Sequence, residues 1–74
     1  FSASTEIEEI NKLENYQIDT KGYKTLGGLV SNLVKESGYE LEMGTMVDDG
    51  EYIYEIVKIS SNVIETISIS KISG

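Results

Sequence analysis

The stretch TLGGLVSNLV, residues 25–34, decides the fold that we expect for this chain. Its apolar side chains recur at the spacing i, i+3, i+4, i+7 and i+8, which is typical of one buried face of an α-helix. These side chains are Leu26, Leu29, Val30, Leu33 and Val34. Thr25 is a favourable N-cap before them, and Ser37-Gly38 supplies a left-handed stop after them. The sequence therefore predicts an amphipathic helix between Thr25 and Gly38.

Two glycines, Gly27 and Gly28, stand in the first turn of this helix, where each costs up to about 1 kcal/mol relative to alanine. One explanation is close packing of the helix against a strand or against the rings of Tyr52 and Tyr54. The other is an anion held at the positive helix start. We favour packing because the formal net charge of −7 repels anions and no phosphate-binding glycine motif is present. The alternative phosphate or nucleotide site would comprise Lys21, Lys24, Thr25, Gly27 and Gly28.

The second half of the chain has the pattern of an antiparallel meander of three strands. Thr45 to Val47 begins an extended segment, and Asp49-Gly50 is a strong hairpin signal. The return strand covers Glu51 to Ile59. Its apolar residues alternate on one face as far as Ile56 and lie on the other face from Val57. The phase of the last strand shifts at Glu65-Thr66. Each shift indicates a β-bulge or a local twist.

The first part of the chain predicts a short helix. Thr5 and Glu8 have the spacing of a capping box, and a narrow apolar stripe follows over about nine residues. The stripe consists of Ile7, Ile10 and Leu13. The loop from Asn15 to Gly22 should turn its side chains Tyr16 and Ile18 back under the chain.

These elements together predict a single α+β domain over residues 1–74, with its core at about residues 5–71 and frayed ends at residues 1–4 and 73–74. We expect a small two-layer domain, in which two helices pack on a mainly antiparallel sheet that includes the three-stranded meander.

Composition excludes several classes of function. The chain has no cysteine and no histidine, which removes disulfides, zinc sites of the Cys/His type, thiol nucleophiles and Ser-His-Asp triads. Thirteen acidic residues against six lysines disfavour nucleic acid and anionic lipid as partners. No apolar run approaches the roughly 20 residues that span a bilayer. We therefore expect no catalytic residue, no cofactor, no nucleic acid and no direct membrane insertion by this segment.

Acidic residues gather at the predicted hairpin tip, where Asp48, Asp49 and Glu51 follow the earlier Glu40 and Glu42. Oxygen ligands of this kind suit Mg²⁺ or Ca²⁺, so a metal site at Asp48, Asp49 and Glu51 is one interpretation. We favour a solvated tip that protects the sheet edge, because the spacing of a calcium loop is absent.

Several motifs taken together resemble a known family. They are Tyr23-x-Thr25-Leu26-Gly27-Gly28-Leu29-Val30, a glycine at Gly44 that opens a strand, Tyr52-x-Tyr54-x-Ile56, and Ile64-x-x-Ile67. In this order they resemble the transporter-associated domain of the CorC/HlyC family, over about residues 5–71.

The resemblance implies a cytoplasmic C-terminal module of a bacterial membrane protein. Such a module follows a transmembrane region and a pair of CBS domains in hemolysin-like transport proteins, or ends certain cation/proton antiporters. It would modulate ion transport, commonly of magnesium or cobalt, without performing chemistry. Its expected partners are the CBS domains and membrane region of its own parent chain, or a second copy in a homodimer. The competing interpretation is a ligand sensor, with a nucleotide at the helix start at Thr25 or a divalent cation at the tip from Asp48 to Glu51.

Overall fold

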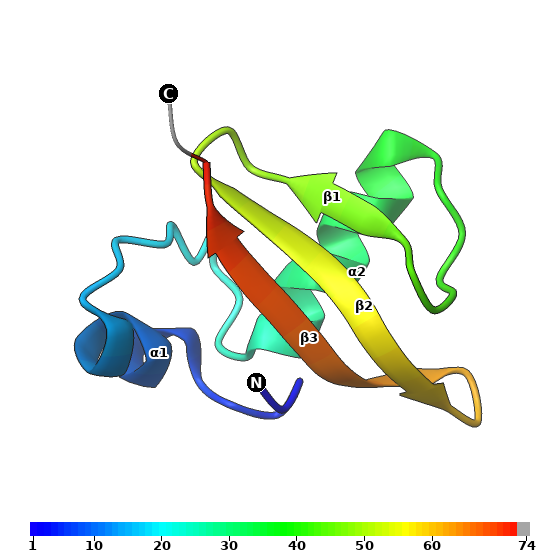
Figure 1. The fold of residues 1–74 in the computed structure, drawn as a ribbon, viewed down its shortest axis with the longest axis horizontal. Coiled ribbons are helices and arrows are strands. Elements are labelled where there is room, and N and C mark those ends of the chain that lie inside the picture. Colours follow the sequence, from blue (N-terminus) through cyan, green and yellow to red (C-terminus); the bar gives the residue numbers. More distant parts are fainter. Residues whose placement is uncertain (73–74) are drawn as a thin grey trace.

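The computed structural model describes residues 1–72, in which two helices precede a sheet of three strands. The elements are α1 (Ile7–Glu14), α2 (Leu26–Ser37), β1 (Met46–Asp48), β2 (Tyr52–Ser60) and β3 (Val63–Lys71). The strands pair antiparallel in the order β1-β2-β3. Figure 1 shows α2 lying across one face of the sheet and α1 standing beside the layer pair, on the β3 side. The predicted two-layer α+β fold is confirmed.

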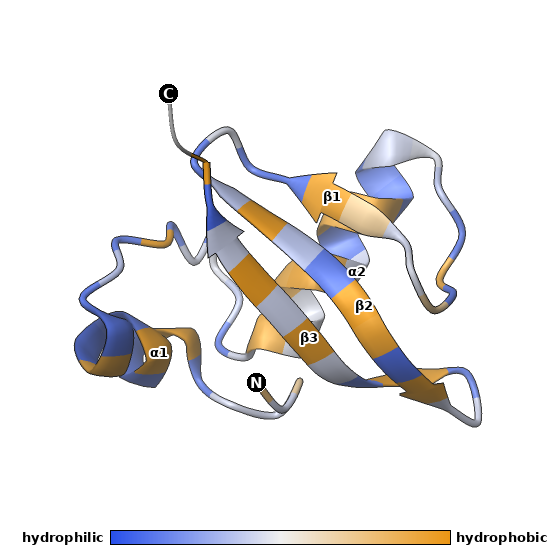
Figure 2. Cartoon of the chain, in the orientation of Figure 1, coloured by the Kyte–Doolittle hydropathy of each residue, from blue (hydrophilic) through white to orange (hydrophobic). Residues whose placement is uncertain are grey.

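The core lies between α2 and the sheet. All five residues of the predicted apolar stripe of α2 are buried. From the sheet they meet Val47, Tyr52, Tyr54, Ile56, Ile64 and Ile67, which are also buried. Figure 2 shows orange, hydrophobic segments on α2 and on each of the three strands. The predicted helix was therefore correct in its extent and in its buried face, because its hydrophobic period is complete.

The two bulges that the phase shifts suggested are both present. Three successive pairs across β2 and β3 are Ile56 with Ile67, Lys58 with Thr66, and Ile59 with Ile64. This pairing skips Val57 on β2 and Glu65 on β3. Because each strand contains one extra residue, the register is the same on both sides of the irregularity. Ile64 and Ile67 therefore both reach the core although they are three residues apart.

The start of α1 differs from the prediction. Its N-cap is Glu6, whose side chain makes no capping hydrogen bond, so the predicted capping box of Thr5 and Glu8 is wrong. The reason is a contact between distant parts of the chain. The carbonyl oxygen of Thr5 accepts a hydrogen bond of 3.0 Å from the amide of Leu26, and the amide of Ile7 donates to the carbonyl of Lys24 at 3.0 Å. This short antiparallel bridge joins the starts of the two helices.

The predicted stripe of α1 is wrong at its last position. Ile7 and Ile10 are fully buried, but Leu13 is 70% exposed, because the helix ends at Glu14 and its last turn has passed beyond the core. The loop after it packs as predicted. Ile18 is buried, and Asn11 fixes it by donating to its carbonyl at 3.1 Å and accepting from its amide at 3.0 Å.

The N-terminal segment is part of the fold, contrary to the expected fraying at residues 1–4. Phe1 and Ile67 exchange two backbone hydrogen bonds of 2.8 Å, and the amide of Ala3 donates to the carbonyl of Glu65 at 2.8 Å. The segment therefore covers the outer edge of β3 at its bulge. The expected fraying at residues 73–74 lies outside the described residues.

Candidate functional site

The start of α2 was the first candidate site, and its backbone amides already have protein partners. The amide of Leu26 donates to Thr5, that of Gly27 to the carbonyl of Ala3 at 2.8 Å, and that of Gly28 to Oγ1 of Thr25 at 3.3 Å. Thr25 is therefore the N-cap of α2, as predicted. Anions bind helix starts through free backbone amides. In this turn the amides that a phosphate would need already donate hydrogen bonds within the protein.

The two glycines of this turn differ in how tightly they are packed. A Cβ atom added at Gly27 would lie 3.0 Å from Cβ and 3.1 Å from the carbonyl oxygen of Ala3. A Cβ at Gly28 would lie 3.2 Å from Cδ1 of Tyr23. Close packing was therefore predicted correctly for Gly27, where the neighbour includes backbone, while at Gly28 the neighbour is an exposed side chain; the partners were predicted wrongly. They are Ala3 and Tyr23, and neither a strand nor the rings of Tyr52 and Tyr54 makes the contact.

The hairpin tip was the second candidate site, and the carboxylates of Asp48 and Asp49 accept hydrogen bonds from the turn and from β2. Oδ1 of Asp49 accepts from the amides of Glu51 at 2.9 Å and Tyr52 at 2.8 Å, while Oδ2 accepts from the hydroxyl of Tyr54 at 2.9 Å. Oδ2 of Asp48 accepts from the amide of Gly50 at 2.9 Å. Among residues 1–72 no three acidic side chains converge as a metal-binding group.

The contact between Asp49 and Tyr54 displaces the pKa of both groups. Burial of the Asp49 carboxyl acts to raise its pKa, but the hydrogen bonds from Glu51, Tyr52 and Tyr54 outweigh burial and hold the pKa below its usual value. Burial, and then the neighbouring Asp49 carboxylate, raise the pKa of the Tyr54 hydroxyl. The pair therefore stays as a carboxylate and a neutral phenol, which makes it a fixed link between the hairpin and the core.

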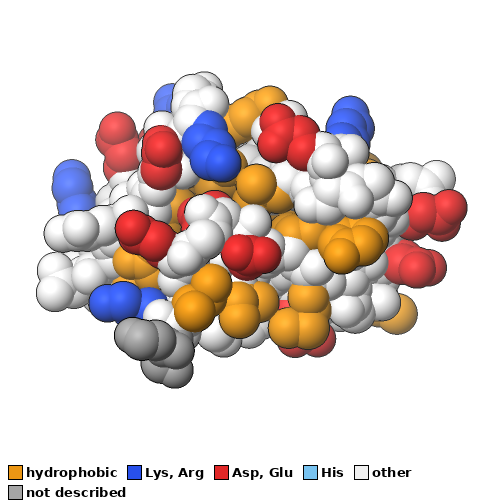
Figure 3. Space-filling view, turned by 90° about the horizontal axis from the view of Figure 1, so that it is seen from above, with side chains coloured by type: hydrophobic (Ala, Val, Ile, Leu, Met, Phe, Trp, Pro, Cys, Tyr) orange, Lys and Arg blue, Asp and Glu red, His pale blue; other side chains and the backbone are white. Residues whose placement is uncertain are grey.

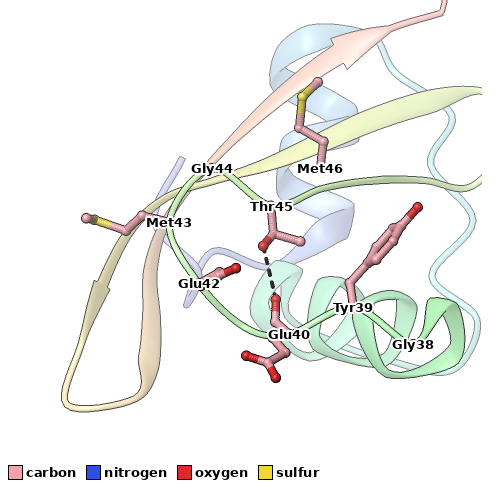
Figure 4. A pocket seen from close by; sticks show the side chains of 8 residues that line it. All are labelled: Gly38, Tyr39, Glu40, Glu42, Met43, Gly44, Thr45 and Met46. Carbon is pink, nitrogen blue, oxygen red and sulfur yellow. Dashed lines mark hydrogen bonds between the residues drawn. The ribbon is translucent and has the colours of Figure 1, made fainter.

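A third region, between α2 and β1, is absent from the sites that the sequence predicts. Between α2 and β1 the residues Gly38, Tyr39, Glu40, Glu42, Met43, Gly44, Thr45 and Met46 line an open depression of about 570 Å³. Figure 4 shows its side chains around the loop, which the hydroxyl of Thr45 fixes by donating to the carbonyl of Glu40 at 3.0 Å. The available signal was the alternation of apolar and acidic residues in Tyr39-Glu40-Leu41-Glu42-Met43, which carries no chemical motif.

A family model for the transporter-associated domain CorC_HlyC matches residues 1–73. The chain belongs to this family. No curated protein matches it. The family is a transporter-associated domain family and is not known as an enzyme family. In the described part of this transporter-associated domain, neither helix has the length and apolarity needed to cross a bilayer.

Solved structures agree with this membership. A conserved protein of unknown function from Haemophilus influenzae superposes with a TM-score of 0.80 at 22% identity, covering 97% of this chain and 85% of that chain. A region from Neisseria meningitidis, assigned as associated with a Mg²⁺ and Co²⁺ transporter (CorC), has a TM-score of 0.73 at 25% identity, with 97% and 85% covered. The transporter-associated domain CorC_HlyC from Nitrosomonas europaea has a TM-score of 0.69 at 20% identity, with 97% and 84% covered.

Proposed function

We propose that this domain is a non-catalytic regulatory module of a CorC-type membrane transporter, and that it modulates the transport of a divalent cation such as Mg²⁺ or Co²⁺. The observation that carries the proposal is the match of the transporter-associated family model to residues 1–73. The module would stand on the cytoplasmic side of the membrane, as part of a longer chain.

The geometry supports a role in binding protein partners. At the start of α2 the amides of Leu26 and Gly27 donate to Thr5 and Ala3, and at the hairpin tip the carboxylates of Asp48 and Asp49 accept from turn amides, which supports a structural use of these groups. Large apolar side chains, by contrast, remain exposed on several parts of the surface. Figure 3 shows such side chains interspersed with acidic ones on one face of the molecule. A small domain gains stability when it buries surface of this kind against a partner.

The proposed partners are the CBS domains and the membrane region of the parent chain. A second copy of the domain is the other candidate, since symmetric pairs are common among small modules. Both partners would act through contact, because no chemical step is assigned to the domain.

Ion flux tests this proposal directly. The parent transporter is reconstituted in liposomes, with and without residues 1–74, and Mg²⁺ and Co²⁺ uptake is followed with a metal-sensitive dye. We expect a change in uptake rate at equal amounts of inserted protein. An unchanged rate at equal insertion would remove the regulatory role.

A further inference from the structure

The segment between α2 and β1 concentrates exposed apolar side chains. Within eight residues, Tyr39 is 59% exposed, Leu41 38%, Met43 65% and Met46 53%. Tyr39 and Met46 both line the depression between α2 and β1, and in Figure 4 Met43 points outward from the loop. Together with β1 they form a surface that we call the β1 edge surface (residues 39–48). Methionine and tyrosine adapt to varied partners and are favoured in protein interfaces.

The outer edge of β1 borders this surface. The carbonyl of Thr45 accepts from the amide of Ile56 at 2.9 Å, and the amide of Asp49 donates to the carbonyl of Tyr52 at 3.2 Å. Because hydrogen-bonded and non-bonded pairs alternate in an antiparallel ladder, the backbone groups of Met46 and Asp48 point away from β2. An edge of this kind can pair with an additional extended strand.

The charge of the β1 edge surface has one sign. Its depression is lined by Glu40 and Glu42 and by no lysine. Asp48 continues the edge, and Glu55 lies opposite Met46 on the neighbouring strand. The formal net charge of the whole chain is −7 and therefore has the same sign. A partner for this surface therefore needs positive charge as well as apolar side chains.

We propose that the β1 edge surface docks an extended protein segment in which apolar side chains alternate with lysine or arginine. The segment adds a strand to the edge at Met46 and Asp48, places an apolar side chain beside Tyr39 and Met46, and sets its positive charges against Glu40 and Glu42. This inference deepens the proposed function, on which it rests, by naming the surface and the chemistry of the partner.

Charge also distinguishes this occupant from two others. A second copy would bring a net charge of −7 against the same acidic surface, and an anionic lipid surface would be repelled in the same way. A basic segment is attracted, and its binding weakens as salt screens the charges. The salt dependence is thus a signature of the proposed occupant.

Peptide titration followed by NMR tests the inference. The ¹⁵N-labelled chain is titrated with Lys-Val-Lys-Leu-Lys-Val-Lys, with its acidic counterpart Glu-Val-Glu-Leu-Glu-Val-Glu, with Lys-Ser-Lys-Ser-Lys-Ser-Lys, and with the first peptide methylated at alternate backbone nitrogens. We expect the first peptide alone to shift the amide signals of residues 39–48. Methylation should abolish the shifts, because it blocks pairing with the edge.

Variants of the chain locate the contact. The double variant Tyr39→Ser/Met46→Thr and the charge reversal Glu40→Lys/Glu42→Lys should each weaken binding by about tenfold or more. Leu13→Ser, at an exposed position on α1, is the matched control and should leave it unchanged. Circular dichroism and the dispersion of the NMR spectrum verify that each variant is folded.

Three results would overturn the inference. The first is equal binding of the acidic peptide. The second is that the basic peptide shifts signals outside residues 39–48 and not within them. The third is a doubling of the sedimenting mass that the Tyr39→Ser/Met46→Thr variant reverses. The last result would assign the surface to a second copy. If deletion of the domain changes ion flux while the basic peptide fails to bind here, the docking inference fails and the regulatory role stands.

Discussion

The backbone amide of Gly27 donates a hydrogen bond of 2.8 Å to the carbonyl oxygen of Ala3. The amide of Ala3 in turn donates to Glu65 in the bulge of β3. Ala3 thus links the first turn of α2 to the edge strand of the sheet. A side chain at position 27 would enter this contact, which explains why glycine occupies a helical position at which it is otherwise unfavourable.

Gly27→Ala should lower the free energy of unfolding by about 1–2 kcal/mol, since overpacking against Ala3 exceeds the gain in helix propensity. The matched control is Gly28→Ala. Its new Cβ would meet the ring of Tyr23, which is exposed and can move, so stability should be unchanged or slightly raised. Urea denaturation measures both. Equal effects of the two substitutions would contradict the proposed contact.

Thr25→Ala should destabilise the chain by about 1 kcal/mol, because it removes the hydroxyl that accepts from the amide of Gly28. Thr5→Ala is the comparison, since the structure assigns no cap to the Thr5 side chain at α1. We expect its effect to stay within about 0.5 kcal/mol. Thermal unfolding of the two variants separates them, and a larger loss at Thr5 would restore the capping box.

Asp49→Asn should reduce the acid sensitivity of the fold. The pKa of Asp49 lies below its usual value of 3.8, so the folded state favours the carboxylate. The unfolded state then binds more protons between the lowered pKa and 3.8, and stability from this group is full above 3.8 and lost as the pH falls through the folded-state pKa. The variant should be less stable at neutral pH and lose less stability in this acidic window.

Urea titrations from neutral pH down through the acidic window measure this difference. Glu14→Gln, at an exposed position at the end of α1, serves as the control. The link between Asp49 and Tyr54 would carry no stability if Asp49→Asn and the control lost equal stability on acidification.

Ile10→Val and Leu13→Val separate the buried from the exposed side of α1. The first removes a methyl group from a fully buried side chain and should cost about 1 kcal/mol. The second changes a side chain that is 70% exposed and should have little effect. Chemical denaturation measures both, and a comparable loss at Leu13 would show that α1 buries its whole stripe.

Local patterns in the sequence were sufficient to predict α2 and the strands. The apolar period of α2, the cap at Thr25 and the stop at Gly38 are all set by residues that lie close together in the chain. The bulges at Val57 and Glu65 were visible as phase shifts, because side chains on a strand alternate and an extra residue changes their phase.

The errors arose where distant segments meet. The carbonyl of Thr5 accepts from the amide of Leu26. Ala3 accepts from Gly27 and donates to Glu65. Neither the start of α1 nor the role of the N-terminal segment therefore follows from neighbouring residues. The β1 edge surface was missed for a related reason. Its importance depends on the free edge of β1 beside it, and a short strand does not show in the sequence whether it stands at an edge.

We propose that this domain acts by binding protein, with no ligand of its own. The most direct measurement titrates the ¹⁵N-labelled chain with the CBS pair of its parent and, separately, with Mg²⁺, Co²⁺ and ATP. We expect saturable shifts with the CBS pair and none with the small ligands. Shifts at the start of α2 or at the hairpin tip with ATP or a metal ion, and none with the CBS pair, would contradict it.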